Sequence, residues 1–146
     1  MTELRGNFAR RRGGAESGVE INQITESVID AGLEIHRMLG PGLLESVYES
    51  VLARELALRG LHVQRQVALP VIGKGEILED AFRADLIVEG KIIVELKSVE
   101  KTAPVHKKQV ITYLKLTGMK VGLLLNFGTE LFKDGIERLV NGAPDL

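Results

Sequence analysis

The chain contains no cysteine and no tryptophan, and its two tyrosines and four phenylalanines make up only 4% of the 146 residues. Without cysteine there can be no disulfide, no thiolate catalysis and no Cys-ligated zinc, which fits a cytoplasmic protein. So few aromatic side chains also argue against a platform on which nucleic-acid bases would stack.

Long apolar runs and a strong net charge are absent too. No segment is apolar over the length that crosses a bilayer, and the N-terminus lacks the apolar centre of a signal peptide, so we expect no membrane association. Because the formal net charge is −1, nucleic-acid binding would depend on local basic patches and metal ions. The sequence also has no phosphate-binding glycine loop, nucleophile elbow or dinucleotide fingerprint, which argues against kinases, α/β hydrolases and nicotinamide enzymes.

The remaining sequence has the length and composition of one globular domain preceded by a polar tail. Residues 1–20 are rich in glycine and serine and carry the run Arg10–Arg12, without apolar periodicity, so they are predicted to form a flexible tail. A solvated basic tail is the simplest interpretation of these arginines, although they could also touch a phosphate backbone. Residues 21–146 are expected to form a single domain.

The apolar pattern of this domain predicts an α/β fold with a mixed sheet packed by helices. An antiparallel meander supplies three strands, and a crossover helix adds a parallel strand. Residues 130–140 could form either a hairpin or a short helix. The predicted elements are helices at 22–39, 43–59 and 102–116, and strands at 61–72, 82–88, 92–98 and 121–127.

Two charged residues, Glu95 and Lys97, interrupt the apolar strand at 92–98. They point to the same face, and ionised groups are rarely buried unless they are paired or hold a metal. If the turn before this strand is Glu89-Gly90-Lys91, Asp85 of the preceding strand lies opposite Glu95, with Cβ atoms about 5 Å apart. A two-residue turn would send Glu95 to the other face, so we predict the three-residue turn or an equivalent bulge.

Two carboxylates in that position suit a hard cation such as Mg²⁺ or Mn²⁺, with the carbonyl of Leu96 as a third candidate ligand. Such a cation could activate water for phosphodiester hydrolysis, and Lys97 could orient the water or stabilise charge on the phosphoryl group. The alternative is an ion pair of Lys97 with Asp85 or Glu95. That pair would leave one negative charge uncompensated.

Two helical segments carry further candidates. Glu45 and Tyr48 share one face of the helix at 43–59, where Glu45 would also favour the helix dipole, and that capping role is the simpler explanation. On the helix at 102–116, His106, Gln109 and Tyr113 share a side, which is either a substrate-contacting face or an ordinary half-exposed one. The neighbouring lysines, Lys101, Lys107 and Lys108, form the most basic ordered part of the chain.

Taken together, these residues resemble the GxxExxY family of the PD-(D/E)XK nuclease superfamily. The motifs that carry the resemblance lie at residues 35–49, 82–88, 94–97, 109–115 and 123–128. The resemblance implies a restriction-endonuclease-like core, with Asp85, Glu95 and Lys97 on its catalytic signature and Glu45 as its additional acidic residue. Gln109 and Tyr113 are similar to the Gln-x-x-x-Tyr motif of RecB-type exonucleases. Ala84 stands where the signature has proline.

The sequence therefore predicts a Mg²⁺- or Mn²⁺-dependent nuclease acting on DNA. The expected catalytic residues are Glu45, Asp85, Glu95 and Lys97, with Asp85, Glu95 and Glu45 as metal ligands. The expected substrate-binding residues are Gln109, Tyr113, His106 and Tyr48. A catalytically silent nucleic-acid- or protein-binding module on the same fold is the main alternative, and an enzyme acting on a small phosphate is another. The sequence leaves a homodimer open.

Overall fold

A computed structural model describes residues 14–142, with backbone alone at 14–19, 72 and 78–81. Nine elements follow one another along this part of the chain. They are α2 (Gly14–Leu39), α3 (Glu45–Leu58), β1 (Val63–Gly73), β2 (Glu76–Val88), β3 (Ile92–Lys97), α4 (Pro104–Thr117), β4 (Val121–Asn126), the 3₁₀ helix η1 (Phe132–Gly135) and β5 (Ile136–Val140). Between residues 14 and 142, no helix is both long and apolar enough to cross a membrane.

The strands form one mixed sheet in the order β1-β2-β3-β4-β5. β3 and β4 pair in parallel, and the other neighbours pair antiparallel. The helix α4 makes the crossover that a parallel pair requires. This arrangement confirms the predicted fold class of an antiparallel meander extended by a parallel strand.

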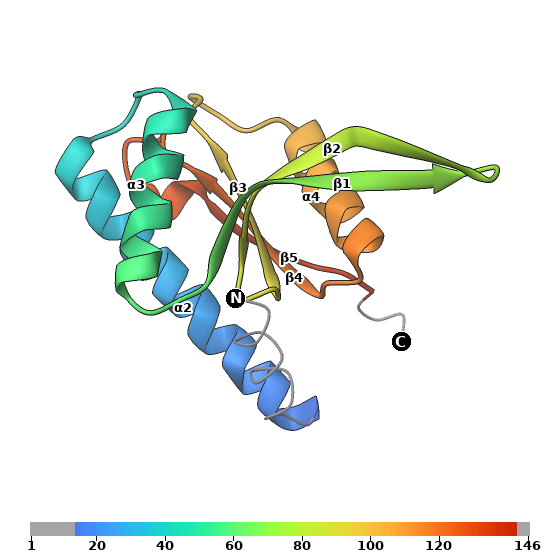
Figure 1. Cartoon of the computed structure of the whole chain (residues 1–146). Helices are drawn as coiled ribbons and strands as arrows, with labels where there is room; N and C mark the ends of the chain where they lie inside the picture. Colours follow the sequence, from blue (N-terminus) through green and yellow to red (C-terminus); the bar gives the residue numbers. More distant parts are fainter. Residues whose placement is uncertain (1–13, 143–146) are drawn as a thin grey trace.

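Helices cover both faces of the sheet, giving three layers (Figure 1). On one face α2 and α3 pack over a core that includes Leu86, Val94 and Leu96. On the other face α4 packs over a smaller core that includes Ile93 and Leu124. Because alternate residues of β3 serve the two cores, Glu95 lies on the α4 side of the sheet, in line with Ile93.

The helix α2 begins earlier than the sequence predicts. Its helical backbone starts at Gly14, not near Asn22, so residues 14–20 of the expected tail belong to this helix. Residues 1–13 of that tail, with Arg10–Arg12, lie outside the described residues. Lys91 in the β2–β3 turn forms an ion pair with Glu20 at 2.9 Å. This tertiary contact holds the early turns of the helix, which local sequence alone does not favour.

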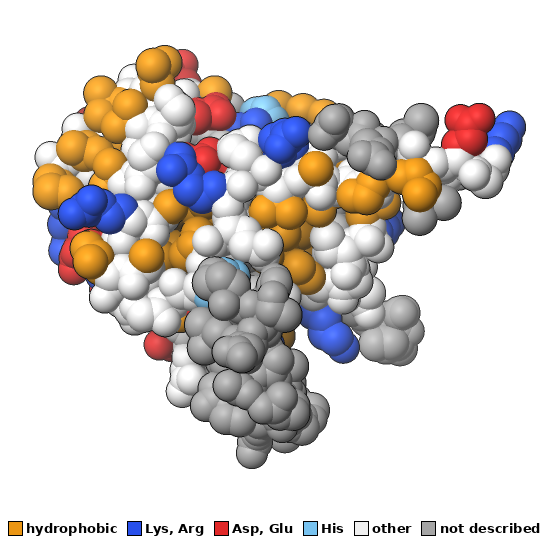
Figure 2. All heavy atoms as spheres, in the orientation of Figure 1, with side chains coloured by type: hydrophobic (Ala, Val, Ile, Leu, Met, Phe, Trp, Pro, Cys, Tyr) orange, Lys and Arg blue, Asp and Glu red, His pale blue; other side chains and the backbone are white. Residues whose placement is uncertain are grey.

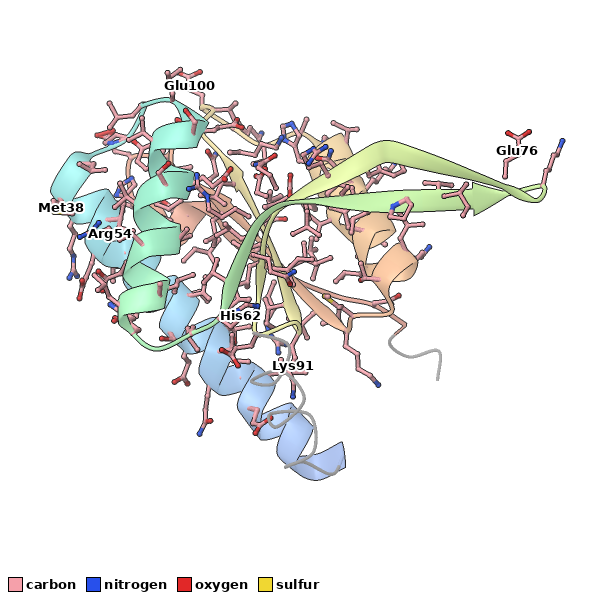
Figure 3. The ribbon with its side chains drawn as sticks, viewed as in Figure 1. Met38, Arg54, His62, Glu76, Lys91 and Glu100 are labelled. Carbon is pink, nitrogen blue, oxygen red and sulfur yellow. The ribbon has the colours of Figure 1, made fainter. Side chains whose placement is uncertain are left out.

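The strands β1 and β2 extend beyond the sheet as a two-stranded arm. β2 begins at Glu76, whereas the sequence predicted a strand only from Phe82. The pairing of β1 with β2 shifts between Leu69 and Val71, and the arm continues to the turn after Gly73. Figures 1 and 3 show the arm projecting past α4, with Glu76 at its far end.

Where the arm leaves the sheet, β1 and β2 change the face that they present to the helices. Val63 and Leu86 pack on the α2–α3 side. A few residues further into the arm, Val67 and Ala84 pack on the α4 side. In regular strands they would share a face with Val63 and Leu86, because they lie an even number of residues away from them. The switch occurs at Gln66 and Asp85. At Gln66 the backbone is left-handed, with φ 48°.

The C-terminal segment resolves the alternative that the sequence left open. Residues 132–135 form the single turn η1, and β5 then pairs antiparallel with β4, from Val121–Val140 to Leu125–Ile136. The sequence predicted either a hairpin or a short helix here, and the chain forms a short helical turn followed by a single strand.

Candidate active site

The β2–β3 hairpin has the register that a shared site requires. Val88 pairs with Ile92 across the turn Glu89-Gly90-Lys91, and the pairing continues to Leu86 with Val94. The three-residue turn is therefore confirmed. Asp85 and Glu95 are the next residues in this register, so their side chains face each other on adjacent strands.

At Asp85 and Glu95, hydrogen bonds to the two side-chain carboxylates take the place of backbone-to-backbone bonds between β2 and β3. Glu95 Oε1 accepts a hydrogen bond of 2.9 Å from the amide of Asp85, and Asp85 Oδ2 accepts one of 2.9 Å from the amide of Leu96. The strands separate here because β2 turns away into the arm. The separation opens room between the strands for two acidic side chains.

Burial makes the ionised form of both carboxylates costly. Glu95 is 3% exposed, and burial, followed by the negative charge of Asp85, raises its pKa to about 8. Burial also raises the pKa of Asp85, although hydrogen bonds from Leu96 and Gln66 partly oppose the shift. Asp85 therefore opposes ionisation of Glu95, and ionising both acids together needs compensation by positive charge.

Lys97 does not provide that compensation directly. Its charge lowers the pKa of both Asp85 and Glu95. Within residues 14–142, however, it forms no ion pair within 4.0 Å with either, so the ion pair weighed as the alternative is absent. The ammonium group lies near the carboxylates without neutralising them, and it keeps its donors for another partner.

The donor set fits a hard divalent cation, which prefers carboxylate oxygens and retained water. Within the described residues, Glu95 Oε2 accepts no hydrogen bond, while Asp85 Oδ1 accepts only the long one, 3.2 Å, from Gln66. The described part of the chain has no cluster of three or more His, Asp or Glu side chains placed to hold a metal ion. A cation here would therefore rest on two carboxylates and complete its coordination with water.

Glu45 lies at the edge of this site. It is the first residue of α3, it is exposed, and its Oε2 is 3.4 Å from the amide of Ser98 just after β3. Its charge contributes to the raised pKa of Glu95. Glu45 is thus within electrostatic range of Glu95 and forms no direct contact with either central carboxylate. A role through water suits this position.

One turn along α3, Glu49 is the more buried glutamate, at 7% exposure. Its carboxylate accepts hydrogen bonds from Arg65 Nε at 3.1 Å and from Gln66 Nε2 at 2.6 Å. Gln66 also donates to Asp85 Oδ1. No sequence pattern marks Gln66, because its left-handed backbone and its contact with Glu49 depend on tertiary structure.

The α4 residues form a connected group beside the site, and their arrangement corrects one prediction. Gln109 Nε2 donates to the hydroxyl of Tyr113 at 2.8 Å. The same hydroxyl accepts from the amide of Arg83, while burial, followed by Glu95, raises the pKa of Tyr113. Tyr113 is only 2% exposed and packs edge-on against Phe82. Tyr113 therefore holds the side-chain amide of Gln109 and is too buried to contact a bound nucleic-acid strand.

His106 and Tyr48, the other expected substrate contacts, have structural roles. His106 Nδ1 accepts from the amide of Ala103 and caps α4. Tyr48 is fully buried, stacks on Phe127 with ring centroids 4.4 Å apart, and bonds through its hydroxyl to Gly40 O and Leu43 N. The prediction of substrate contact is wrong for Tyr48, because this hydroxyl fixes the α2–α3 link.

A surface cavity of about 640 Å³ opens at the end of β4 next to this site, beside Asn126, the residue paired with Lys97. Three lysines line it, Lys101, Lys107 and Lys108, together with the acidic residues Glu100, Asp134 and Glu137. Lys107 is 3.5 Å from Glu137. On the face seen in Figure 2, lysine and arginine side chains lie in separate groups with no continuous basic stripe.

This combination, an α/β sheet with opposed carboxylates on neighbouring strands and a lysine two residues on, agrees with the relationships of the sequence. The chain belongs to the PD-(D/E)XK nuclease superfamily, whose sequence profile matches residues 22–139. The narrower GxxExxY family stays a prediction.

Other comparisons give less. No curated protein matches the chain significantly. Among solved structures, the crystal structure of SSO0001 is similar at 18% identity over 84% of this chain and 79% of that one, with a TM-score of 0.39.

Proposed function

We propose that the protein is a nuclease that hydrolyses phosphodiester bonds of DNA with the help of Mg²⁺ or Mn²⁺. The observation that carries the proposal is the facing pair Asp85–Glu95, which leaves Oδ1 and Oε2 largely free of hydrogen bonds and has Lys97 nearby without an ion pair. Ionising both acids needs positive charge in addition to that of Lys97, and a bound divalent cation would supply it.

The chain's own residues divide the work as follows. Asp85 and Glu95 would hold the cation, and Glu45 would act through a water molecule from the first turn of α3. A bound divalent cation would lower the pKa of its water and neutralise charge on the phosphoryl oxygens. Lys97 would orient the attacking water and stabilise the developing negative charge.

The strand to be cut would approach along α4. Gln109, held by Tyr113, is half-buried and offers its amide at the edge of the site. The exposed Lys101 and Lys108 line the cavity beside Asn126 and suit contacts with successive phosphates. A cytoplasmic location and a homodimer stay predictions.

The test is cleavage of single- and double-stranded DNA with and without Mn²⁺, comparing wild type with Glu95→Gln and Lys97→Ala. We expect metal-dependent cleavage by wild type and a loss of at least about 100-fold in each variant. Glu26→Gln, at an exposed acid of α2 on the opposite side of the sheet, is the matched control and should cut like wild type.

The rival function is a silent binding module, and a second measurement separates it. Ligand binding to the native state raises its stability, by about 2.7 kcal/mol at 100 times the dissociation constant. Wild type should therefore melt at a higher temperature in millimolar Mn²⁺, and Glu95→Gln should not. A wild type that neither shifts with Mn²⁺ nor cuts DNA would support the binding module.

A further inference from the structure

A strained residue lies beside the proposed metal site. Within residues 14–142, three residues other than glycine have a positive φ: Gln66, Lys74 and Glu89. Lys74 and Glu89 occupy the β1–β2 and β2–β3 turns, where that conformation is ordinary. Gln66 lies within strand β1, where a left-handed backbone is strained, and such strain is kept where the surroundings require it.

Gln66 is held at both its side-chain amide and its backbone carbonyl, and the amide lies at the carboxylates. Its side-chain Nε2 lies 2.6 Å from Glu49 Oε1 and 3.2 Å from Asp85 Oδ1, so one amide donates to carboxylates from two different elements. The backbone carbonyl of Gln66 accepts a hydrogen bond of 2.9 Å from Arg83 Nη1. The β1–β2 register places Gln66 opposite Asp85, and the left-handed residue adds the contact with Glu49 of α3.

The hydrogen bond from Gln66 is accepted by Asp85 Oδ1, the carboxylate oxygen that does not bind the amide of Leu96. Asp85 Oδ2 is held by Leu96, so the Gln66 bond to Oδ1 sets the rotation of the carboxylate. Glu49 holds the amide of Gln66 in turn, and Arg65 holds Glu49. Partners that orient a metal-ligating carboxylate in this way commonly change metal affinity 10- to 100-fold when they are removed.

We propose that Gln66 is a positioning residue of the metal site, which uses a strained backbone to orient Asp85 for a divalent cation and to tie it to Glu49. The assignment rests on the proposed metal-dependent function, since Asp85 must hold a cation for its orientation to matter.

The experiment separates the backbone of Gln66 from its side chain. Gln66→Gly removes the amide but accepts a left-handed backbone without strain, whereas Gln66→Ala loses the amide and keeps the strain. Lys74→Gly is the matched control, since it places glycine at a left-handed position in the turn of the arm, away from the carboxylates. For each protein, calorimetric titration with Mn²⁺, metal-free melting temperature and DNA cleavage are measured.

We expect Gln66→Gly to melt no lower than Gln66→Ala without metal, to bind Mn²⁺ about 10-fold more weakly than wild type, and to cut DNA at least about 10-fold more slowly. Lys74→Gly should match wild type in affinity and cleavage. If Gln66→Gly binds Mn²⁺ and cuts DNA like wild type, Gln66 only shapes the strand. That result overturns the assignment of Gln66 and leaves the proposed function standing. A wild type that neither binds Mn²⁺ nor cuts overturns the proposed function and this assignment together.

Discussion

At the scale of single residues, the dominant feature is a carboxylate pair that the metal-free fold tolerates at a cost. Glu95 has an ordinary pKa of 4.5, which the fold raises to about 8. This destabilising carboxylate pair lies where strands β2 and β3 separate. Such a loss of stability is typical of a functional site, in this case one that would be stabilised by a bound cation.

The pH dependence of metal-free stability follows from this shift. Between pH 4.5 and about 8 the folded protein keeps a proton on Glu95 that the unfolded chain has lost, so the unfolding free energy should fall as pH rises through this range. One such proton accounts for up to about 1.4 kcal/mol per pH unit. Urea titrations in EDTA measure the trend.

Glu95→Gln is the control for this slope. Glutamine still accepts the amide of Asp85 through its oxygen, so the substitution should raise metal-free stability at pH 8 and flatten the dependence on pH. An unchanged slope in Glu95→Gln would assign the pH dependence to other groups.

Tyr48 gives a second prediction at this scale, because its hydroxyl bonds two backbone groups of the α2–α3 link. Tyr48→Phe should lower the unfolding free energy by about 1–2 kcal/mol through the loss of these bonds. Mn²⁺ affinity and the KM for DNA should stay at wild-type values, measured on the folded protein below its melting range. A raised KM with unchanged stability would restore Tyr48 as a substrate contact.

At the scale of elements, the ends of β3 and β4 are locked together directly behind Lys97. Asn126 Oδ1 accepts from the amides of Val99 and Gly128, and the amide of Phe127 donates to Lys97 O. A Cβ at Gly128 would overlap the backbone of Val99. The lysine's position therefore depends on a close backbone approach between two loops.

Gly128→Ala should push these loops apart. We expect a loss of about 1–3 kcal/mol in unfolding free energy from overpacking, together with slower cleavage because Lys97 moves. Gly73→Ala is the matched control, since a Cβ there meets nothing within 4 Å. Chemical denaturation and cleavage assays compare the two, and equal stability of both variants would contradict the close approach.

The elements also show how far the sequence could predict the fold. Period-two and helical patterns located the three helices and the core strands, and the odd-length turn gave the register of Asp85 and Glu95. The β2 half of the arm was missed because Glu79 and Asp80 break the pattern of a strand. Gln66 could not be predicted, because a left-handed residue inside a strand depends on tertiary contacts with Glu49 and Asp85.

At the scale of the whole molecule, electrostatics would limit the proposed binding of DNA. The net charge of −1 and the separate basic groups in Figure 2 indicate weak binding without metal. Much of the attraction for phosphates would have to come from the cation itself.

Local lysines should nevertheless contribute a measurable salt dependence. Lys101→Ala and Lys108→Ala should each weaken DNA binding in EDTA and reduce the slope of log affinity against log salt by about 1. Fluorescence anisotropy over a range of salt concentrations measures the slope. Lys115→Ala, at the other end of α4, is the control, and an equal effect there would mean that the cavity next to Asn126 is not the path of the strand.

The exchange of ladder bonds for carboxylate bonds at Asp85 and Leu96 has a spectroscopic consequence. Each amide proton is bonded to one oxygen of a carboxylate whose other oxygen is proposed to bind the cation. When a cation withdraws electron density from those carboxylates, both hydrogen bonds weaken. The two resonances should then move upfield and their solvent exchange should quicken, while the amides of the regular β3–β4 ladder stay constant. The backbone thus supplies its own pair of probes for site occupancy, readable without a substrate.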